Sequence, residues 1–404
     1  MSERPLRIAI FGESYLPYLS GVTVSTEALA RGLGAAGHEV LLVAPAPARG
    51  RAVGTAGALG PDPRHAWLPS IQLPRPAPVG YRVPWPLPSA ALRAARAFAP
   101  DVVHAQSPFT SGLMARRVAR RVGAPLVFTH HTRFGDYGHY LGPLARPGRA
   151  VVAAYLRRYW AACAAVVAPG SELADEIEAR LRGRRRPVVR VIPTGIEVSA
   201  IQALEAHDPR PMADWPSEAM VVATLGRLAP EKSVELLFDA FAAVAAKVSS
   251  LRLLVVGGGP SEAALRERAA APDLAGRVHL TGQLPRIEAL AMIKGADLFA
   301  AASRTETQGL VLAEALSAGL PVVALAGPGV ADSVRDRIDG LIVPAEPAGE
   351  RSVRLAAALR QLIDEPELRA TLGAAAVEGA SRFSVESRIA GVVALYRELL
   401  GGQV

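Results

Sequence analysis

Residues 220–260 read MVVATLGRLAPEKSVELLFDAFAAVAAKVSSLRLLVVGGGP. This stretch starts with the apolar run Met220–Leu225, which ends at a glycine and a charged loop. A helical pattern over Val234–Val248 follows, and a second apolar run, Leu251–Val256, ends at three glycines. Short apolar runs that alternate with amphipathic helices are typical of parallel sheets, whose strands are joined by crossover helices. The stretch therefore predicts a strand–helix–strand unit of an α/β domain.

The same alternation continues in both directions along the chain. Toward the C-terminus, strands are predicted at Val278–Leu280, Leu298–Ala301 and Pro321–Ala324, and helices at Glu262–Ala270, Arg286–Lys294 and Leu310–Ala318. Toward the N-terminus, helices are predicted at Val22–Ala36 and Gly112–Val122, and strands at Arg7–Phe11, Glu39–Ala44, Asp101–Ala105, Pro125–His130, Ala164–Ala168 and Val188–Ile192. Gly37 would end the first helix as a left-handed cap.

Two doubly wound, Rossmann-like α/β domains are expected, because 404 residues are too many for one compact core. An irregular segment, roughly 199–217, separates the two alternating series. We therefore expect an N-terminal domain over residues 1–198 and a C-terminal domain over residues 199–383. A final helix near Ser387–Leu400, within residues 384–404, would rejoin the first domain. Ligands of such sheets bind where the strands end, so the site is expected in a central cleft that the two domains face.

The composition excludes several other classes of protein. Half of the residues are apolar and a fifth are charged, which excludes a mostly disordered chain. The single cysteine, Cys163, excludes an intramolecular disulfide and a cysteine-based metal cluster. The net charge is +8, but only three of the 45 basic residues are lysines. The arginine excess therefore reflects either a coding bias or an acidic partner.

The sequence also bears on the cellular location. No apolar run reaches the ~18 residues of a membrane-spanning helix. The N-terminal residues lead directly into a strand, without the apolar segment of a secretion signal. We expect a cytoplasmic protein, and a peripheral position on the inner face of the cell membrane stays open. No stacking motif or nucleic-acid-binding module accompanies the basic charge, so no nucleic acid partner is expected.

The stretch Thr305–Ala315, TETQGLVLAEA, places two carboxylates around the start of a helix. A helix that begins near Gly309 offers free backbone N–H groups and a positive dipole end to an anion such as a diphosphate. Glu306 before the helix and Glu314 within it can accept hydrogen bonds from two hydroxyl-bearing parts of one ligand. The alternative is that Glu314 is an exposed helix residue and Glu306 an ordinary partner of the helix dipole.

The loop after the strand Met220–Leu225 carries two cations. Gly226 permits close backbone approach, and Arg227 and Lys232 can converge on phosphate oxygens. The alternative is a solvated loop in which Lys232 pairs with Glu231. The triplet Gly257–Gly259 is not a dinucleotide fingerprint, because position 262 is Glu; it is either a plain turn or a floor for a planar base.

A pair of histidines, His130 and His131, ends another predicted strand. Because strand side chains alternate, one ring is expected to point inward and the other toward the end of the sheet. A histidine at that end can make polar contact with a substrate. The alternative is a histidine with a purely structural hydrogen bond.

These segments together resemble the retaining family 4 glycosyltransferases, which have the GT-B fold. The resemblance rests on Ser20-Gly21-Val22, His131, Gly226-Arg227 with Lys232, and Glu306 with Glu314, in order and at the family's spacing. It implies that Gly21 lets its loop approach the donor diphosphate and that Arg227 and Lys232 neutralise that diphosphate. Ser20 departs from the family pattern, because many members carry a second glycine there.

The resemblance also assigns the rest of the donor site. It implies that Glu314 binds the nucleotide ribose and that Glu306, with the backbone of Gln308, Gly309, Leu310 and Val311, holds the donor sugar. His131 would lie beside the 6-hydroxyl of that sugar, and Gly258 and the turn at 282–284 would line the base pocket. Catalysis would then fall to His131, Glu306, Arg227 and Lys232. No Asp-x-Asp pair occurs in the chain, so no metal or other cofactor is expected.

Within the family, residues 129–140 and 305–310 are similar to the diacylglycerol glucosyltransferases and, nearly as much, to the phosphatidylinositol mannosyltransferases. This similarity implies transfer of a hexose from UDP-glucose to a lipid, with diacylglycerol favoured. The alternatives are a GDP-mannose-dependent transfer to a phosphoinositide, a soluble acceptor, and a sugar-nucleotide-binding protein that is not an enzyme. A dinucleotide oxidoreductase is disfavoured, because the first strand–helix turn lacks its glycine fingerprint.

A lipid acceptor would need a membrane-facing surface, and three basic stretches lie in the first half of the chain. They are Arg116–Arg121, Arg157–Trp160 and Arg180–Arg190. A predicted helix over Val151–Ala162 mixes arginines with Tyr155, Tyr159 and Trp160, which favours docking on an anionic bilayer. Residues 80–87 would form an apolar insertion loop. The alternative is that these segments are solvated helix faces of an arginine-rich protein.

Overall fold

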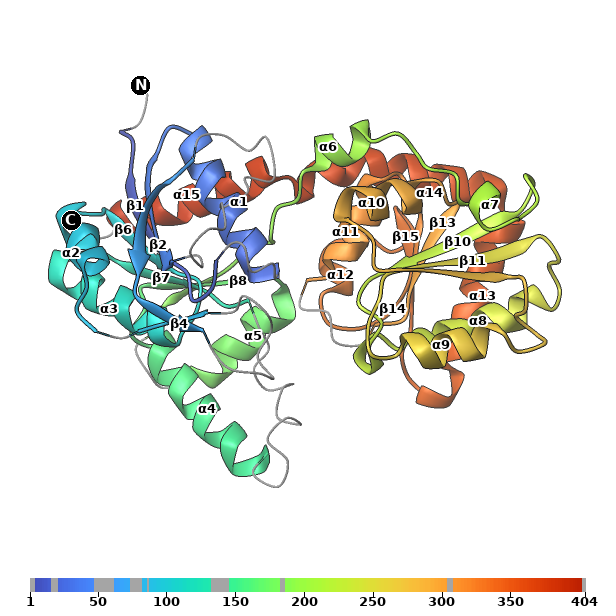
Figure 1. The fold of residues 1–404 in the computed structure, drawn as a ribbon, viewed down its shortest axis with the longest axis horizontal. Coiled ribbons are helices and arrows are strands. Elements are labelled where there is room, and N and C mark those ends of the chain that lie inside the picture. The colour runs from blue at the N-terminus through green and yellow to red at the C-terminus, as the bar shows by residue number, and fades with distance from the viewer. Residues whose placement is uncertain are drawn as a thin grey trace. The chain divides into compact units, whose positions relative to one another are not determined.

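The computed structural model describes residues 4–15, 21–46, 62–72, 82–85, 87–131, 145–181, 186–303 and 308–401. The chain forms two compact units (Figure 1). The first unit combines Met1–Gly195 with Val385–Val404, and the second unit is Ile196–Ser384. The final helix therefore belongs to the first unit, and the second unit is inserted between its parts. Each unit contains one parallel β-sheet with helices on both faces.

The sheet of the first unit has seven parallel strands in the order β3-β2-β1-β6-β7-β8-β9. Its strands are β1 (Arg7–Phe11), β2 (Glu39–Pro45), β3 (Arg64–Leu68), β6 (Val102–Ala105), β7 (Leu126–Thr129), β8 (Ala165–Ala168) and β9 (Val188–Val191). The strand order reverses between β1 and β6, which is where such sheets bind ligands. Two further strands, β4 (Ser70–Gln72) and β5 (Arg82–Pro84), form an antiparallel pair.

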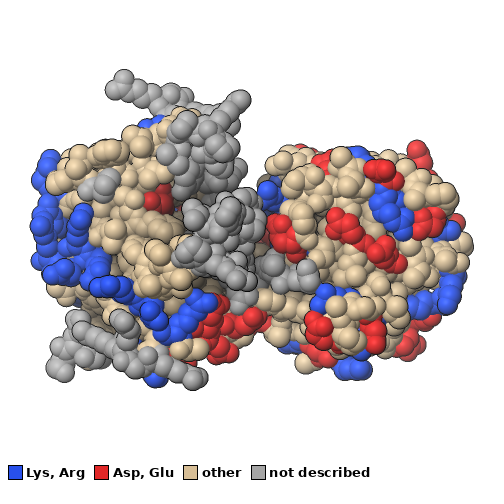
Figure 2. Space-filling model, turned by 90° about the horizontal axis from the view of Figure 1, so that it is seen from below, with Lys and Arg blue, Asp and Glu red and all other residues tan. Residues whose placement is uncertain are grey.

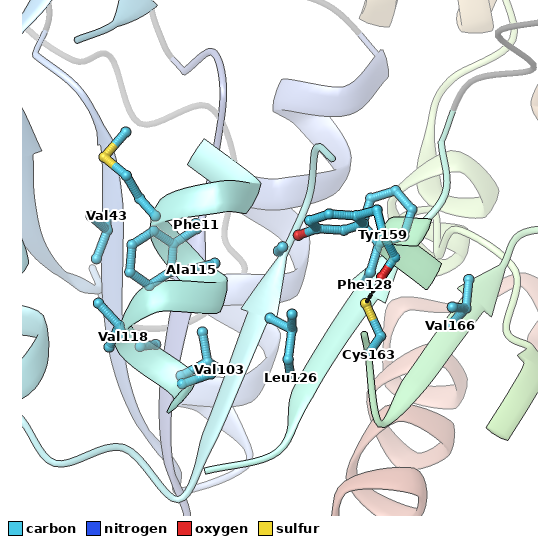
Figure 3. Close-up of a cluster of buried hydrophobic side chains, with 14 of the residues drawn as sticks. Phe11, Val43, Val103, Ala115, Val118, Leu126, Phe128, Tyr159, Cys163 and Val166 are labelled. Atoms are coloured by element: carbon cyan, nitrogen blue, oxygen red, sulfur yellow. Dashed lines mark hydrogen bonds between the residues drawn. The ribbon is translucent and has the colours of Figure 1, made fainter. Parts of the chain in front are cut away.

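Alternating side chains divide this sheet into two packed faces. Ile8 and Ile10 of β1 pack with helices α1 (Gly21–Ala35) and α15 (Val385–Gly401). Phe11, from the same strand, packs on the opposite face with α3 (Thr110–Val122), as Figure 3 shows. Helices α2 (Ala90–Ala97), α4 (Ala145–Trp160) and α5 (Ser171–Arg180) complete that face. Gly37 follows α1 at a φ of +86° and confirms the predicted helix end.

The helix α4 corrects the predicted membrane helix. Tyr159 and Trp160 are each only 2% exposed and belong to the core of the first unit (Figure 3). Cys163 lies against them and donates a hydrogen bond from Sγ to the carbonyl of Tyr159 at 3.3 Å. Only Arg157 and Arg158 of the predicted anchor are exposed. The helical period explains the result: successive residues are about 100° apart around the helix axis, so the pair Arg157 and Arg158 lies on the side opposite Tyr159 and Trp160.

The sheet of the second unit has six parallel strands in the order β12-β11-β10-β13-β14-β15. Its strands are β10 (Met220–Leu225), β11 (Leu251–Val256), β12 (Val278–Gly282), β13 (Leu298–Ala301), β14 (Val322–Leu325) and β15 (Gly340–Val343). One face is covered by α8 (Val234–Ala245), α9 (Glu262–Ala269) and α13 (Arg351–Asp364). The other is covered by α10 (Arg286–Lys294), α11 (Leu310–Ser317) and α14 (Pro366–Gly379). The strand order reverses between β10 and β13.

The segment predicted to be irregular, 199–217, contains two short helices, α6 (Val198–Ala203) and α7 (Pro209–Met212). Asp208 caps α7 by accepting a hydrogen bond from the Arg210 N–H at 3.0 Å, and Pro209 suits the first helical position. Helices this short show no apolar period, so the sequence pattern missed them. Most of the predicted loop 45–60 lies outside the described residues. Within the described residues, no helix has the length and apolar character needed to span a bilayer.

Candidate active site

A pocket in the second unit lies where β10 and β13 end, at the point where the strand order reverses. It encloses about 340 Å³, part of which is open to solvent. Gly226, Arg227 and Lys232 line it from the loop after β10, and Val311 lines it from α11. Residues that the sequence marks in separate segments are therefore brought together at the ligand-binding edge of one sheet.

The loop after β10 is fixed by close contact with the glycine triplet after β11. Gly226 has a φ of +151°, and Leu228 donates its backbone N–H to the carbonyl of Gly258 at 3.0 Å. A Cβ at Gly257 would overlap the carbonyl oxygen of Gly226, and a Cβ at Gly259 would overlap that of Leu228. Two of the three glycines are thus required by backbone packing. Gly258 is partly buried and accepts the hydrogen bond from Leu228.

The two cations of this loop differ in exposure. Arg227 is exposed, whereas Lys232 is partly buried at the end of the short 3-10 turn Pro230–Lys232. Ser233, at a φ of +49°, ends that turn and leads directly into α8. The turn brings Lys232 back to the pocket that Arg227 also lines. Two positive side chains at the end of the central strand make this edge suitable for phosphate.

The start of α11 is the second part of the site. Gly309 has a φ of +70° and precedes Leu310, the first residue of the helix. The hydroxyl of Ser333 donates to the carbonyl of Gln308 at 2.7 Å. Gly329 packs so tightly on Gln308 that a Cβ there would lie 2.8 Å from its backbone N and Cα. These contacts hold the residues that lead into the helix. Glu306 lies outside the described residues, which omit 304–307.

Glu314 is buried within α11, so the alternative of an exposed helix residue is wrong. Its residue exposure is 3%, and its Oε1 lies 2.5 Å from Nη2 of Arg286 at the start of α10. Burial raises the pKa of the Glu314 carboxyl, and the charge and hydrogen bond of Arg286 act in the opposite direction. Arg286 was not identified from the sequence, because only the packing of α10 against α11 brings the two residues together.

In the first unit, the two histidines after β7 differ as the alternation of strand side chains predicts. His130 is 2% exposed and packs edge-on against the rings of Phe128 and Trp160. His131 is partly exposed, and its Nε2 lies 2.7 Å from Oε1 of Gln106, which follows β6. With the Gln106 amide oriented in this way, its oxygen accepts from Nε2 of His131 and leaves Nδ1 of the ring as an acceptor. Burial, followed by the charges of Arg388 and His130, lowers the pKa of His131 to about 3.

Other polar groups lie at the ligand-binding edge of this sheet. Glu13, two residues beyond β1, accepts hydrogen bonds from the backbone N–H and the hydroxyl of Ser111, at 2.8 and 2.7 Å. Glu13 and Gln106 were missed in the sequence, although polar residues directly after buried strands are a signal for them. Gly21 is exposed as the first residue of α1, and a Cβ there would meet no atom within 4 Å. The fold itself therefore does not require glycine at position 21. Ser20 lies outside the described residues.

Two family models match the chain. Residues 19–200 match the model described as Glycosyltransferase Family 4, and residues 210–378 match the model described as Glycosyl transferases group 1. A GDP-mannose-dependent alpha-mannosyltransferase of Mycobacterium tuberculosis is 30% identical over 377 residues, which cover 93% of each chain. The alpha-monoglucosyldiacylglycerol synthase of Acholeplasma laidlawii is 28% identical over 328 residues, 79% of this chain and 80% of that protein.

Solved structures give the same fold. Sucrose-phosphate synthase from Thermosynechococcus elongatus matches 99% of this chain and 100% of its own, with a TM-score of 0.71 and 20% identity. The Anabaena protein HepE in complex with UDP-glucose matches 97% of this chain and 100% of its own, with a TM-score of 0.66 and 19% identity.

The two parallel-sheet domains have the GT-B fold. The chain belongs to glycosyltransferase family 4, and it is a hexosyltransferase.

Proposed function

We propose that the protein is a retaining glycosyltransferase that moves glucose from UDP-glucose to a lipid acceptor, with diacylglycerol as the first candidate. The proposed binding of a nucleotide-sugar donor rests on one observation: the same pocket is lined by Gly226, Arg227, Lys232 and the start of α11. The acceptor part is supported by the similarity to the glucosyldiacylglycerol synthases of Acholeplasma laidlawii and Streptococcus pneumoniae. The chain covers 80% and 76% of those proteins, so the likeness extends over most of each.

The proposed chemistry follows from the charge that must be stabilised. As the bond from the sugar to the diphosphate breaks, negative charge grows on the leaving phosphate. Arg227, Lys232 and the N–H groups at the start of α11 are fixed positive partners for that charge. Retention places the incoming hydroxyl on the same face as the departing diphosphate. Glu314 would then accept hydrogen bonds from the ribose, while Glu306 and the backbone from Gln308 to Val311 would hold the sugar.

His131 would contribute to donor recognition from the first unit. With its proton on Nε2 and its pKa lowered, the ring stays neutral and presents Nδ1 as an acceptor. A sugar hydroxyl donates to such a nitrogen, which fits the role beside the 6-hydroxyl. Gly21 would let the backbone before α1 approach the diphosphate. Gly258 would lie at the edge of the base pocket.

A face of the first unit has the character of a membrane-docking surface. We name it the α3 face; it comprises the exposed arginines Arg117, Arg120, Arg121, Arg157 and Arg158 and the exposed apolar residues Trp85, Leu87, Phe109, Leu113 and Val151. Among the described residues, none of these arginines forms an ion pair. Figure 2 shows a band of Lys and Arg side chains on this unit.

The parts of the α3 face lie on neighbouring elements. Phe109 at the start of α3 stacks on Tyr155 of α4, with ring centroids 6.2 Å apart. Strand β5, which precedes Trp85, also packs against α3. Exposed apolar side chains beside exposed arginines match an anionic bilayer, where each basic group contributes about 1 kcal/mol. The proposed anchor is therefore α3 and the residues after β5, in place of the buried aromatic residues of α4.

No metal is required in this proposal, because Arg227, Lys232 and the start of α11 already supply positive charge to the diphosphate. Transfer should continue at an unchanged rate in excess chelator. The test is the initial rate with and without chelator, followed by addition of magnesium or manganese. A reproducible loss of activity that either ion restores contradicts the proposal.

A second donor is favoured by one observation, the similarity over 93% of the chain to a GDP-mannose-dependent mannosyltransferase. One experiment separates the two. The protein is incubated with UDP-glucose, UDP-galactose or GDP-mannose over diacylglycerol vesicles, and the product is identified by mass and by its anomeric configuration. An α-glucosyl diacylglycerol is expected. Transfer of mannose contradicts the proposal that UDP-glucose is the donor. Transfer only to a soluble acceptor contradicts the proposed lipid acceptor. A product of inverted anomeric configuration contradicts the retaining chemistry.

A further inference from the structure

Arg286 occupies a position that no motif of the sequence marks. It is the first residue of α10, directly after the turn that follows β12. Its Nη2 lies 2.5 Å from Oε1 of Glu314. The side chain of Glu314 is 4% exposed, whereas that of Arg286 is 57% exposed. The guanidinium of a mostly exposed arginine therefore contacts the carboxylate of a buried glutamate.

We propose that Arg286 is a positioning residue for the donor nucleotide: its guanidinium engages one carboxylate oxygen of Glu314, which leaves the other oxygen for the ribose. This inference rests on the proposed function, in which Glu314 binds the ribose. Among the described residues, the contact with Arg286 is the only hydrogen bond or ion pair of the Glu314 carboxylate. Its Oε2 therefore has no protein partner in the part of the chain that is described.

The protonation state of Glu314 decides how it meets a ribose. Ribose hydroxyls donate to a carboxylate oxygen, and a protonated carboxyl group loses part of that accepting capacity. Burial raises the pKa of Glu314, while the charge of Arg286 opposes the shift. Removal of the arginine would leave burial unopposed, so the pKa would rise further and the buried acid would take up a proton more readily.

No other charged group replaces Arg286 in this role. Helix α11 packs against α6, α10, α12 (Val330–Ser333), α14, β14 and the 3-10 turn Ala380–Phe383. Neither α6 nor β14 carries a charged residue. The other charged residues of these elements are Glu288, Lys294, Asp332, Glu367, Arg369, Glu378 and Arg382. None of them contributes to the pKa shift of Glu314.

The three cations in this set have other partners. Lys294 donates to backbone carbonyls, among them that of Gln202 at 2.6 Å, and Arg382 pairs with the buried Asp339 at 2.7 Å. Arg369 donates to the carbonyl of Leu362 at 2.6 Å. The inference therefore depends on one arginine, and a single substitution tests it.

The test measures binding of UDP-glucose and of GDP-mannose by calorimetry, without acceptor, from about pH 6 to pH 8. The phosphates of these donors are diesters with no group that titrates in this range, so a pH dependence reports on the protein. Arg286→Met removes the charge and keeps the apolar stem, whereas Arg286→Lys keeps the charge. The matched control is Arg360→Met, which removes a partly exposed arginine paired with Asp364 on α13.

The affinity of the parent for the donor should be nearly the same at pH 6 and at pH 8, and the same should hold for Arg360→Met. Arg286→Met should bind the donor severalfold more weakly near pH 6 than near pH 8, because burial of Glu314 then acts without an opposing charge and the lower pH favours its protonated form. Arg286→Lys should restore most of the affinity at low pH. If Arg286→Met shows the pH dependence of the parent, or loses affinity equally at every pH, the inference is overturned. Failure of Arg286→Lys to restore binding also overturns it.

Glu314→Gln separates this inference from the proposed function. If neither donor binds the parent, the proposed donor site and the inference fail together. If the parent binds a donor and Glu314→Gln binds it equally well, Glu314 does not bind the ribose. The positioning role of Arg286 is then contradicted as well. If Glu314→Gln weakens binding while Arg286→Met keeps the affinity and pH dependence of the parent, only the inference about Arg286 fails.

Discussion

Lys232 is one of three lysines among 45 basic residues, so coding bias does not explain why lysine stands there. The turn that ends at Lys232 carries it to the pocket wall beside Arg227. An ammonium group fixed at this place stabilises the charge that grows on a leaving phosphate more than the charge of the bound donor.

Lys232→Ala should lower kcat about 100-fold or more, the usual cost of one lost transition-state partner, with the fold intact. The measurement is the rate of hexose transfer at saturating donor, with circular dichroism as the check on folding. Lys247→Ala, which removes an exposed lysine beyond α8, is the matched control. If a folded Lys232→Ala variant has the same kcat as the parent, Lys232 does not stabilise the leaving phosphate.

His131 should make stability depend on pH. Burial and the charges around it lower its pKa from 6.5 to about 3. The unfolded state therefore binds one more proton than the folded state between these values. The free energy of unfolding should fall as the pH falls through this window, by about 1.4 kcal/mol per pH unit for this residue. His104, which is fully buried and also has a lowered pKa, adds to the effect.

Urea denaturation near pH 7 and near pH 5 tests this dependence. His131→Asn should lose less stability than the parent between the two pH values, because the titrating ring is gone. His207→Asn changes an exposed histidine of the second unit and should follow the parent. An equally steep loss in His131→Asn would show that this histidine does not titrate as expected.

At the scale of elements, the sequence predicts best the strands that are buried on both faces. The bounds of β1, β10, β11 and β13 agree with the prediction, because each is a mostly apolar run beside a helical pattern. Strand β3, Arg64–Leu68, was missed because it is an edge strand whose exposed and buried residues are mixed. The three-residue strands β4 and β5 are too short for any period to be recognised.

The same limit applies to the candidate site. Gly226, Arg227 and Lys232 could be predicted together because their chemistry lies in one loop after one strand. The ion pair of Arg286 with Glu314 could not be predicted, since it depends on how two helices pack. The burial of Tyr159 and Trp160 could not be predicted either, because composition does not say which side of a helix faces the core.

The short helix α12 acts on the site through Ser333. Its hydroxyl donates to the carbonyl of Gln308, directly before the turn at Gly309 that starts α11. Arg382 holds the same residue by donating to the Ser333 carbonyl at 2.9 Å, and Arg382 is in turn bound by the buried Asp339. This chain of contacts fixes the residues that lead into the donor pocket.

Ser333→Ala should raise the KM for the donor about tenfold and leave the KM for the acceptor unchanged. The buried carbonyl of Gln308 would lose its hydroxyl partner, which costs about 1–3 kcal/mol, and the start of α11 would be less firmly held. Steady-state kinetics with each substrate varied in turn gives both constants. Ser249→Ala removes an exposed hydroxyl of the same unit as a control. An unchanged donor KM in a folded Ser333→Ala variant rejects the role of this contact.

At the scale of the whole molecule, the chain returns to the first unit through α15. Tyr396 on this helix places its hydroxyl 2.6 Å from Nδ1 of His104, and Arg388 donates to the carbonyl of Ser25 at 3.0 Å. The sequence could predict this return, because a helical pattern follows the end of the second alternating series. Residues 385–401 therefore complete the fold of the first unit, whose outer surface carries the α3 face.

Docking of the α3 face on a bilayer is the prediction that concerns the molecule as a whole. Three to five arginine contacts of about 1 kcal/mol each give weak binding that salt screens, whereas insertion of Trp85 and Leu87 adds a part that salt does not screen. Co-sedimentation with neutral and anionic vesicles at low and high salt separates the two parts. The double substitution Arg117→Glu with Arg120→Glu should abolish the salt-sensitive part of vesicle binding. The double substitution Trp85→Ser with Leu87→Ser should abolish the part of vesicle binding that salt does not screen.

The controls decide which helix is the anchor. Arg360→Glu changes a partly exposed arginine on the second unit and should bind vesicles as the parent does. Arg157→Glu with Arg158→Glu should weaken binding less than the α3 substitutions, because the aromatic residues next to this pair are buried and cannot insert. If the α3 variant binds anionic vesicles as well as the parent, the α3 face is not the anchor. If the parent ignores vesicles and glycosylates a soluble acceptor, the lipid acceptor is wrong and the glycosyltransferase assignment alone remains.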